Sequence, residues 1–151
     1  MDVKLVEYDT VFLEKSYEWL SDAEVKELTM TPDIDRGEQK KWFEGLKERR
    51  DYLVKGVVAD GRPIGAVGLK HIDMENKTAE YFGYIGEKDY WGKGIGYRMM
   101  QYLEKEARNM QLSYLYLNVL EKNQIAVNLY KKRGYSIQNK GEKVIRMDKS
   151  L

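Results

Sequence analysis

Three glycines at alternate positions, Gly92, Gly94 and Gly96, form the part of this sequence best suited to contact a ligand. They occur in the stretch YWGKGIGYRMM, between a predicted strand and a predicted helix. Backbone N–H groups at the start of a helix lack partners and carry partial positive charge, so they form a ready anion site. Glycines let a phosphate or pyrophosphate approach these groups without a Cβ in the way. Lys93 could add a positive charge there, or it could simply be solvated.

The glycine spacing alone does not identify the ligand. A P-loop requires Gly-x-x-x-x-Gly-Lys-Ser/Thr, which this stretch lacks. A dinucleotide fingerprint requires Gly-x-Gly-x-x-Gly at the first strand of a parallel unit, with an acidic residue about twenty positions on. Here the spacing is Gly-x-Gly-x-Gly, late in a mostly antiparallel region. A glycine-rich connection that binds nothing is the remaining alternative.

The elements that must position these glycines are predicted from hydrophobic periodicity and turn signals. Apolar residues alternate in the predicted strands and recur every three or four positions in the predicted helices. Strands are predicted at 3–6, 52–59, 63–72, 78–86 and 112–120, followed by a terminal hairpin that closes near Lys140 and Gly141. Helices are predicted from Phe12 to Leu20, from the cap Asp35 to Leu46, through Met99 to Met110, and from Asn123 to Lys132.

Three strands joined by tight turns, followed by a crossover helix, predict a mixed sheet of the α/β (α+β mixed) class. At 151 residues the chain is expected to form a single domain, 1–151.

Composition excludes several classes of site. There are 26 Lys and Arg against 25 Asp and Glu, which argues against a nucleic-acid-binding protein. No Cys is present and only one His, His71, so no metal site is expected. The sequence shows neither an apolar signal core nor an apolar run of membrane-spanning length. We therefore expect a cytoplasmic protein with no membrane partner.

Two motifs in the same order resemble those of the GNAT superfamily of N-acetyltransferases. The segment from Trp91 to Gly96 is similar to the acetyl-CoA signature Gln/Arg-x-x-Gly-x-Gly/Ala, with Trp91 in place of the usual Gln or Arg. The segment from Asn123 to Tyr135 resembles the superfamily's C-terminal cofactor segment. The resemblance covers nearly the whole chain. It implies the GNAT fold, with a mixed, mostly antiparallel sheet of about seven strands flanked by about four helices.

The resemblance also implies a reaction, in which a primary amine attacks acetyl-CoA directly in a ternary complex. A free alkyl amine is mostly protonated at neutral pH, so a general base is useful. Glu80, fourteen residues before Gly94, is the leading base candidate, because histone-type members place a catalytic Glu at this offset. His71 and, more weakly, Glu121 are the other candidates. Tyr130 is the expected acid, which would donate a hydrogen bond to the leaving thiolate.

The same resemblance assigns binding roles. On the strand that enters the glycine stretch, Glu80, Phe82 and Tyr84 share one face, opposite Ala79, Tyr81 and Ile85. The residues expected to bind the cofactor are Tyr84, Ile85, Trp91, Gly92, Lys93, Gly94, Ile95, Gly96, Tyr97, Asn118, Asn123, Ala126 and Tyr130. The residues expected to bind the acceptor are Trp19, Met30, Trp42, Glu80 and Phe82.

The acceptor is the least determined feature of the sequence. The region from Glu18 to Trp42 is similar to that of acetyltransferases of nucleotide-linked amino sugars, which makes a small-molecule amine the first hypothesis. A ribosomal-type protein N-terminus and a polyamine are the alternatives, and a domain that binds acyl-CoA without turnover is a hypothesis of another class. The C-terminal segment VIRMD could form a homodimer, as late strands in this superfamily often do.

Overall fold

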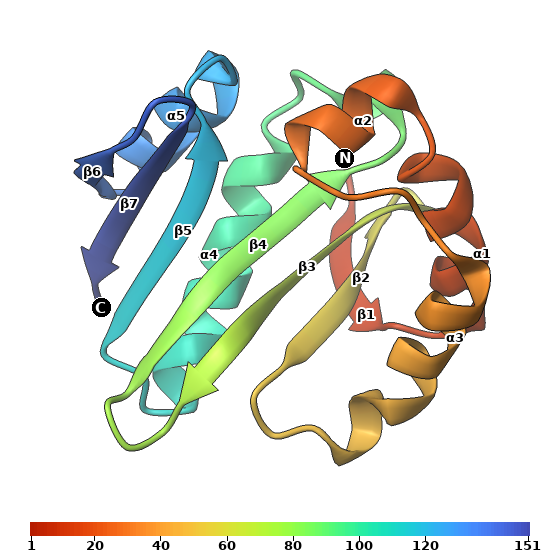
Figure 1. The fold of residues 1–151 in the computed structure, drawn as a ribbon, viewed down its shortest axis with the longest axis horizontal. Coiled ribbons are helices and arrows are strands. Elements are labelled where there is room, and N and C mark those ends of the chain that lie inside the picture. The colour runs from red at the N-terminus through yellow and green to blue at the C-terminus, as the bar shows by residue number, and fades with distance from the viewer.

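All 151 residues are described by the structure, a computed structural model, in which helices cover a single β-sheet (Figure 1). The sheet has seven strands in the order β1-β2-β3-β4-β5-β7-β6. The strands are β1 (Val3–Glu7), β2 (Leu53–Ala59), β3 (Arg62–Asp73), β4 (Thr78–Ile85), β5 (Tyr114–Leu120), β6 (Ser136–Lys140) and β7 (Val144–Ser150). All neighbouring strands are antiparallel except β4 and β5, which are parallel. The prediction of a mixed, mostly antiparallel sheet is therefore confirmed.

Five α-helices are present, whereas the sequence predicted about four. They are α1 (Thr10–Trp19), α2 (Ala23–Leu28), α3 (Arg36–Gly45), α4 (Ile95–Asn109) and α5 (Gln124–Lys132), with 3₁₀ turns η1 (Leu46–Glu48) and η2 (Lys88–Tyr90). The prediction missed α2 because this helix of six residues buries only Val25 and so shows no periodicity. Its start is fixed by Asp22, which accepts hydrogen bonds from the N–H groups of Glu24 and Val25. No helix combines the length and the apolar composition that a membrane span requires.

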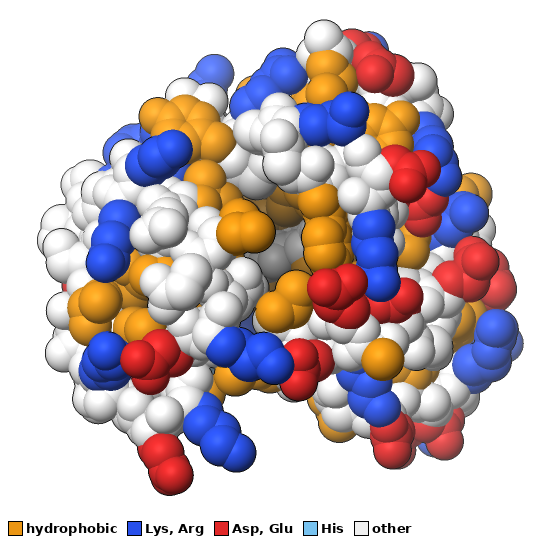
Figure 2. Space-filling view, turned by 90° about the horizontal axis from the view of Figure 1, so that it is seen from above, with side chains coloured by type: hydrophobic (Ala, Val, Ile, Leu, Met, Phe, Trp, Pro, Cys, Tyr) orange, Lys and Arg blue, Asp and Glu red, His pale blue; other side chains and the backbone are white.

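The parallel pairing of β4 with β5 is short. Only three residue pairs are in register, and the last of them joins Glu80 to Tyr116. Beyond this pair the two strands separate toward their carboxyl ends, and Figure 1 shows α4 crossing behind them. Seen from that end, Figure 2 shows a hollow in the surface with hydrophobic side chains in its walls. The second half of β4 therefore borders a gap in the sheet.

The two faces of the sheet are covered unequally. On one face, α4 and α5 pack on a core of 21 buried residues that includes side chains from every strand except β6. On the other face, α1 and α3 pack on a smaller cluster of six buried residues, whose strand contacts come only from β1 to β4. No helix lies over β5, β7 and β6 on this second face (Figure 1). We call this part of the sheet the uncovered face.

Candidate active site

The start of α4 presents a row of free backbone donors. The six N–H groups from Gly92 to Tyr97 donate to no acceptor within the chain, and no side chain caps the helix. Gly92 and Gly94 have φ angles of 74° and 76°, in the left-handed region that favours glycine. A Cβ at either position would meet open space, so their backbone conformation explains the glycines. The exposed Lys93 lies between them, and the arrangement suits an anion at the mouth of the gap.

Gly96 and Trp91 have structural roles in the same segment. A Cβ on Gly96 would lie 2.9 Å from Cδ2 of Leu129, so this glycine lets α4 pack closely on α5. The indole Nε1 of Trp91 donates a hydrogen bond of 2.8 Å to the carbonyl oxygen of Ile85. Trp91 therefore fixes the glycine loop to the end of β4, a role that the sequence did not indicate.

Backbone groups of β4 face the gap. The N–H of Gly86 donates to the carbonyl of Ile64 on β3 at 2.7 Å. In an antiparallel pair, alternate residues direct both peptide groups to the same neighbour. Even-numbered residues of β4 therefore point toward β3, and the N–H groups of Gly83 and Ile85 point toward the gap. Donors in this position suit an oxyanion that forms between the separated strands.

Tyr130 lies on α5, on the α4 side of the sheet. Its ring packs edge-on against Tyr81 of β4, with 6.2 Å between the ring centroids. Its hydroxyl makes no hydrogen bond within the chain, and burial raises the pKa of Tyr130 to about 12. The phenol therefore keeps its proton at neutral pH and has a donor available for a ligand.

Glu80 lies on the opposite face of β4, where the sheet begins to open. Its side chain is 12% exposed. Its Oε2 atom accepts a hydrogen bond of 3.2 Å from Asn118, and Lys70 Nζ lies 3.8 Å from the same oxygen. The His71 Nε2 atom lies 3.6 Å from Oε1. The structure thus places two of the predicted titratable residues, Glu80 and His71, side by side.

A β-bulge explains why His71 reaches Glu80. The register of β3 with β4 shifts between Lys70 and Asp73, and His71 adopts a φ angle of 52°. A bulge re-aims the side chains of the strand that carries it. Both Lys70 and His71 therefore reach the same carboxylate. No group of three His, Asp or Glu side chains is arranged to hold a metal ion.

Asn118, Asn123 and Tyr97 make contacts within the chain. Asn118 is exposed on the Glu80 side of β5, between the buried Leu117 and Val119. The Asn123 side chain caps α5 by accepting from the N–H of Ala126 at 3.3 Å. The ring of Tyr97 lies beneath the Arg133 guanidinium. The remaining predicted cofactor residues in this part of the chain, Ile95 and Ala126, pack in the core around α4 and α5.

The predicted acceptor residues separate into two groups. Trp19 is 3% exposed, donates to Glu87 and packs against Tyr84, so its ring is not open to a ligand. Trp42 packs edge-on against Tyr8 and Tyr52. Phe82 packs against Tyr52 with 5.4 Å between ring centroids. These aromatic side chains pack together where α1 and α3 cover the sheet. Met30 forms the second group, because its side chain is 41% exposed.

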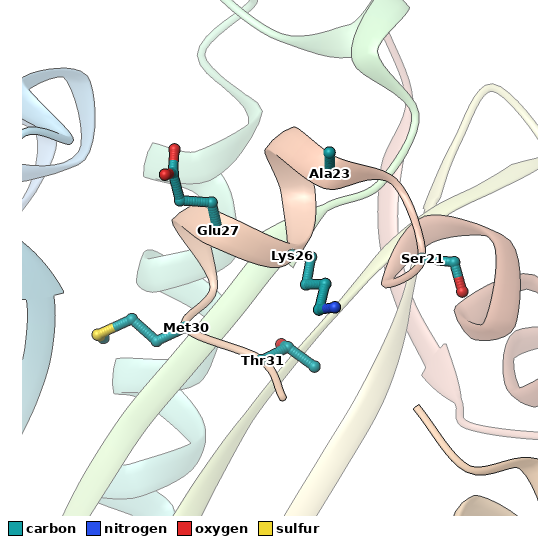
Figure 3. A pocket seen from close by; sticks show the side chains of 6 residues that line it. All are labelled: Ser21, Ala23, Lys26, Glu27, Met30 and Thr31. Atoms are coloured by element: carbon teal, nitrogen blue, oxygen red, sulfur yellow. The ribbon is translucent and has the colours of Figure 1, made fainter. Parts of the chain in front are cut away.

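Met30 borders two hollows beside α2. One, of about 440 Å³, is lined by Ser21, Ala23, Lys26, Glu27, Met30 and Thr31. Figure 3 shows Glu27 and Met30 projecting to the side of α2 that faces β5, whereas Lys26 projects beneath the helix. The other hollow has a volume of about 670 Å³. Glu27 and Met30 line one side of it, and the segments that follow β5 and β6 line the other. Glu121, the weakest base candidate, lines this second hollow and pairs with Lys140 at 3.0 Å.

Sequence reasoning missed three residues near Glu80. Lys70 contacts its carboxylate, Tyr116 pairs with it across the strands, and Arg146 stacks on the Tyr116 ring at 3.9 Å. The signal was the alternation of polar residues with apolar ones in YLYLNVL and VIRMD, which indicates a polar sheet face but not which strands adjoin.

Comparisons with known proteins agree with this geometry. A model of the acetyltransferase (GNAT) family matches residues 13–135. An N-acetyltransferase 9-like protein from Caenorhabditis briggsae is 25% identical over 141 residues, which are 85% of this chain and 71% of that protein.

Two solved structures share the fold. One is a spermidine N-acetyltransferase from Vibrio cholerae in complex with CoA and spermine, with a TM-score of 0.89, 19% identity and coverage of 98% and 95% of the two chains. The other is the Campylobacter jejuni N-acetyltransferase PseH in complex with acetyl coenzyme A, with a TM-score of 0.76, 18% identity and coverage of 99% of both chains.

Proposed function

Since this chain belongs to the acetyltransferase (GNAT) family and is an acyltransferase, we propose that it transfers the acetyl group of acetyl-CoA to a primary amine of a small molecule. The observation that supports this most directly is the row of six free N–H groups from Gly92 to Tyr97, at the mouth of the gap between β4 and β5. Two structural neighbours are in complex with CoA or acetyl coenzyme A. The donor and the type of reaction follow from this family and this site.

The free amides would bind the pyrophosphate of acetyl-CoA, and Lys93 would add a positive charge beside it. The pantetheine arm then runs along the gap, parallel to the free edge of β4. There the N–H groups of Gly83 and Ile85 donate to the arm and to the thioester carbonyl oxygen. As the amine attacks, these donors stabilise the negative charge that develops on that oxygen.

The acid and the base approach the thioester from opposite faces of the sheet. Glu80, on the face of β4 opposite Tyr130, accepts a proton from the attacking amine, directly or through a water molecule. Tyr130, on the α5 side, donates a hydrogen bond to the sulfur as CoA leaves. Tyr81 contacts Tyr130, and its neighbour Glu80 necessarily points to the other face of β4. A thioester held in the gap would thus lie between the base and the acid, so that Glu80 takes the proton of the amine as it adds to the carbonyl carbon and Tyr130 assists the thiolate that the tetrahedral intermediate expels.

His71 is the second candidate for proton transfer. It contacts Glu80 and is exposed, so it would pass the proton from Glu80 to solvent rather than take it from the amine. Glu121 is less suitable, because it is already paired with Lys140 beside the second hollow.

The position of Gly94 gives a direct test of donor binding. Val at Gly94 would have to adopt a left-handed conformation, which is strongly disfavoured for a β-branched residue. We expect Gly94→Val to weaken acetyl-CoA binding about tenfold or more, measured by calorimetry, because the loop must rearrange. Gly61→Val is the matched control, since Gly61 has a φ of 81° and open space around it but lies in the β2–β3 turn.

Unchanged affinity in Gly94→Val, or an equal loss in Gly61→Val, would contradict the proposed donor site. Release of free CoA thiol in the presence of a primary amine tests the transfer itself. Acetyl-CoA binding without thiol release for any amine would instead support a non-catalytic acyl-CoA-binding domain.

A further inference from the structure

Arg146 is a cation that makes no ion pair, on the uncovered face of the sheet. It lies on β7, directly opposite Asn118 of β5, whose amide donates to Glu80. Its guanidinium stacks on the ring of Tyr116 at 3.9 Å, which holds the side chain against the sheet. Its Nε atom is buried without a hydrogen-bond partner, and the side chain makes no ion pair in the chain. Buried polar groups of this kind normally have a partner, so this one calls for an explanation.

The neighbouring carboxylates make no ion pair with Arg146. Asp148, two residues further along the same face of β7, instead accepts a hydrogen bond of 2.8 Å from the Tyr114 hydroxyl. Glu80 is contacted by Asn118, Lys70 and His71. A polycationic amine bound at Glu80 would therefore meet Lys70 on one side and Arg146 on the other. An acceptor with a negative group of its own would instead satisfy Arg146.

The spacing allows one small molecule to contact both residues. Glu80 and Arg146 lie on strands β4 and β7, with only β5 between them. Neighbouring strands lie about 4.8 Å apart and residues about 3.3 Å apart along a strand, and Arg146 is two residues along β7 from Asp148, which is level with Glu80 through Tyr116. The two backbones are therefore about 12 Å apart, and both side chains reach toward β5. The groups bound by the two side chains are thus only a few bonds apart.

The hollows beside α2 offer a weaker site for a polycation. Of the carboxylates there, Glu27 pairs with Lys122 at 2.7 Å and Glu121 pairs with Lys140 at 3.0 Å, which leaves only Glu142 without an ion pair. The cations Lys122 and Lys143 line the same hollow as Glu142.

We propose that the acceptor is an amine that also carries an oxyanion, a phosphate or a carboxylate, and that Arg146 binds this group while Glu80 receives the amine. The proposal rests on the proposed acetyl transfer and narrows its substrate class. Arg146 serves as a specificity residue, because its planar guanidinium can donate two parallel hydrogen bonds to such a group. Phosphate and carboxylate share this chemistry, and matched substrates distinguish them.

The test compares matched amines with the wild type, Arg146→Gln and Arg146→Lys. Glucosamine phosphate is compared with glucosamine, β-alanine is compared with propylamine, and spermidine serves as a polycationic amine. Thiol release at saturating acetyl-CoA gives kcat and KM for each. Arg108→Gln is the control, because Arg108 is an exposed cation on α4 that makes no ion pair.

We expect the wild type to prefer the anionic member of at least one pair. Arg146→Gln should raise KM for that amine by roughly 10- to 100-fold, as expected for the loss of charge-assisted hydrogen bonds. KM for the neutral partner and the affinity for acetyl-CoA should not change. Arg146→Lys should retain part of the preference, and Arg108→Gln should retain all of it. The pair that responds identifies the anion as phosphate or carboxylate.

Two results would overturn the proposal. One is a preference for spermidine or for the neutral amines in the wild type, and the other is an equal loss in Arg146→Gln for the anionic and neutral members. If no amine is acetylated, the acetyl transfer fails, but the anion site remains testable by calorimetry with glucosamine phosphate and β-alanine. Binding of either amine that is lost in Arg146→Gln supports the site, and absence of binding to the wild type refutes it.

Discussion

Glu104 and Glu80 both have largely buried carboxylates, but the two differ in how closely the chain pairs them with cations. Glu104 on α4 is fully buried and accepts hydrogen bonds of 2.7 Å from both Arg133 and Lys149. Glu80 on β4 is slightly exposed and makes only longer contacts, of 3.2 to 3.8 Å, with Asn118 and with the cations beside it. The first carboxylate has its partners within the chain, whereas the second still has room for a ligand.

The difference extends to the regions around them. The Glu104 network joins α4 to the end of α5 and to β7, so it holds the C-terminal strands onto the rest of the molecule. Around the gap, by contrast, the α4 amides, the Tyr130 hydroxyl and the Arg146 Nε have no partner in the chain. Polar groups with complete partners stabilise the fold, and those without partners mark the surface where chemistry is expected.

The largest expected effect is on activity, at Glu80. Glu80→Gln keeps the hydrogen-bonding shape but cannot accept a proton, so kcat should fall by roughly 100- to 10,000-fold. The free energy of unfolding should change by less than about 0.5 kcal/mol, because the contacts of Glu80 are long and partly solvated. Steady-state kinetics and urea unfolding of the same preparation measure both quantities. A near-normal kcat would show that another group acts as the general base, and His71→Gln would then be the next variant to measure.

The complementary change, Glu104→Gln, should affect stability instead. It leaves Arg133 and Lys149 without their counter-charge in a buried position, so the free energy of unfolding should fall by about 3 kcal/mol. Glu106→Gln, on the exposed side of the same helix, is the matched control and should have almost no effect. Equal stability of the two variants in urea would show that the Glu104 network contributes little, and the comparison between the two glutamates would then fail.

A smaller effect on catalysis is expected at Tyr130. Tyr130→Phe removes the donor to the leaving sulfur and should lower kcat about tenfold or more, with little change in the KM for acetyl-CoA. A thioester with a better leaving group should be less sensitive to the substitution, because it needs less help from the donor. If kcat falls equally with every thioester, Tyr130 acts through packing against Tyr81 instead.

Tyr135 packs against Tyr130, but its substitution is expected to change stability and not activity. Its hydroxyl is buried and has no hydrogen-bond partner. Tyr135→Phe removes this unpaired group, so the free energy of unfolding should rise by about 1 kcal/mol while kcat stays the same. A loss of stability or of activity in Tyr135→Phe would show that the hydroxyl has a role in this cluster.

The smallest expected effect is a dependence of stability on alkaline pH. An unfolded tyrosine has a pKa near 10, whereas burial raises the pKa of Tyr130 to about 12. The folded state therefore binds the proton more tightly, and the stability from this group is complete below pH 10 and lost as pH rises toward 12. Urea unfolding between pH 9 and 11 should show a shallower decline in Tyr130→Phe than in the wild type. Parallel curves would contradict the burial of the phenol.

Much of this structure could be predicted from the sequence because its signals are local. The turn at Asp60 and Gly61, the apolar face of α4 and the glycines before it each act within a few residues. The helix α2 was missed because six residues are too few to show a pattern. The role of Trp91 was also missed, because its partner is a carbonyl oxygen, which is the same in every residue.

The site was predicted less completely, because its residues meet through strand order. Arg146 neighbours Asn118 only because β7 pairs with β5, and no spacing along the chain indicates that pairing. His71 reaches Glu80 because the bulge in β3 directs its side chain to the carboxylate that Lys70 also contacts. Conversely, Trp19 lies in the region from Glu18 to Trp42 that suggested an acceptor contact, and the structure buries its indole against Tyr84 of β4.

The three-residue pairing of β4 with β5 also has a consequence for the order of folding. Strands β2, β3 and β4 are joined by tight turns, so their contacts close short loops and form early. The pairing of β4 with β5 must await the whole intervening crossover, including α4. We expect hydrogen exchange to protect the amides of β3 before those of β5 during refolding. The chain would then acquire its capacity for chemistry only in the last step of its assembly.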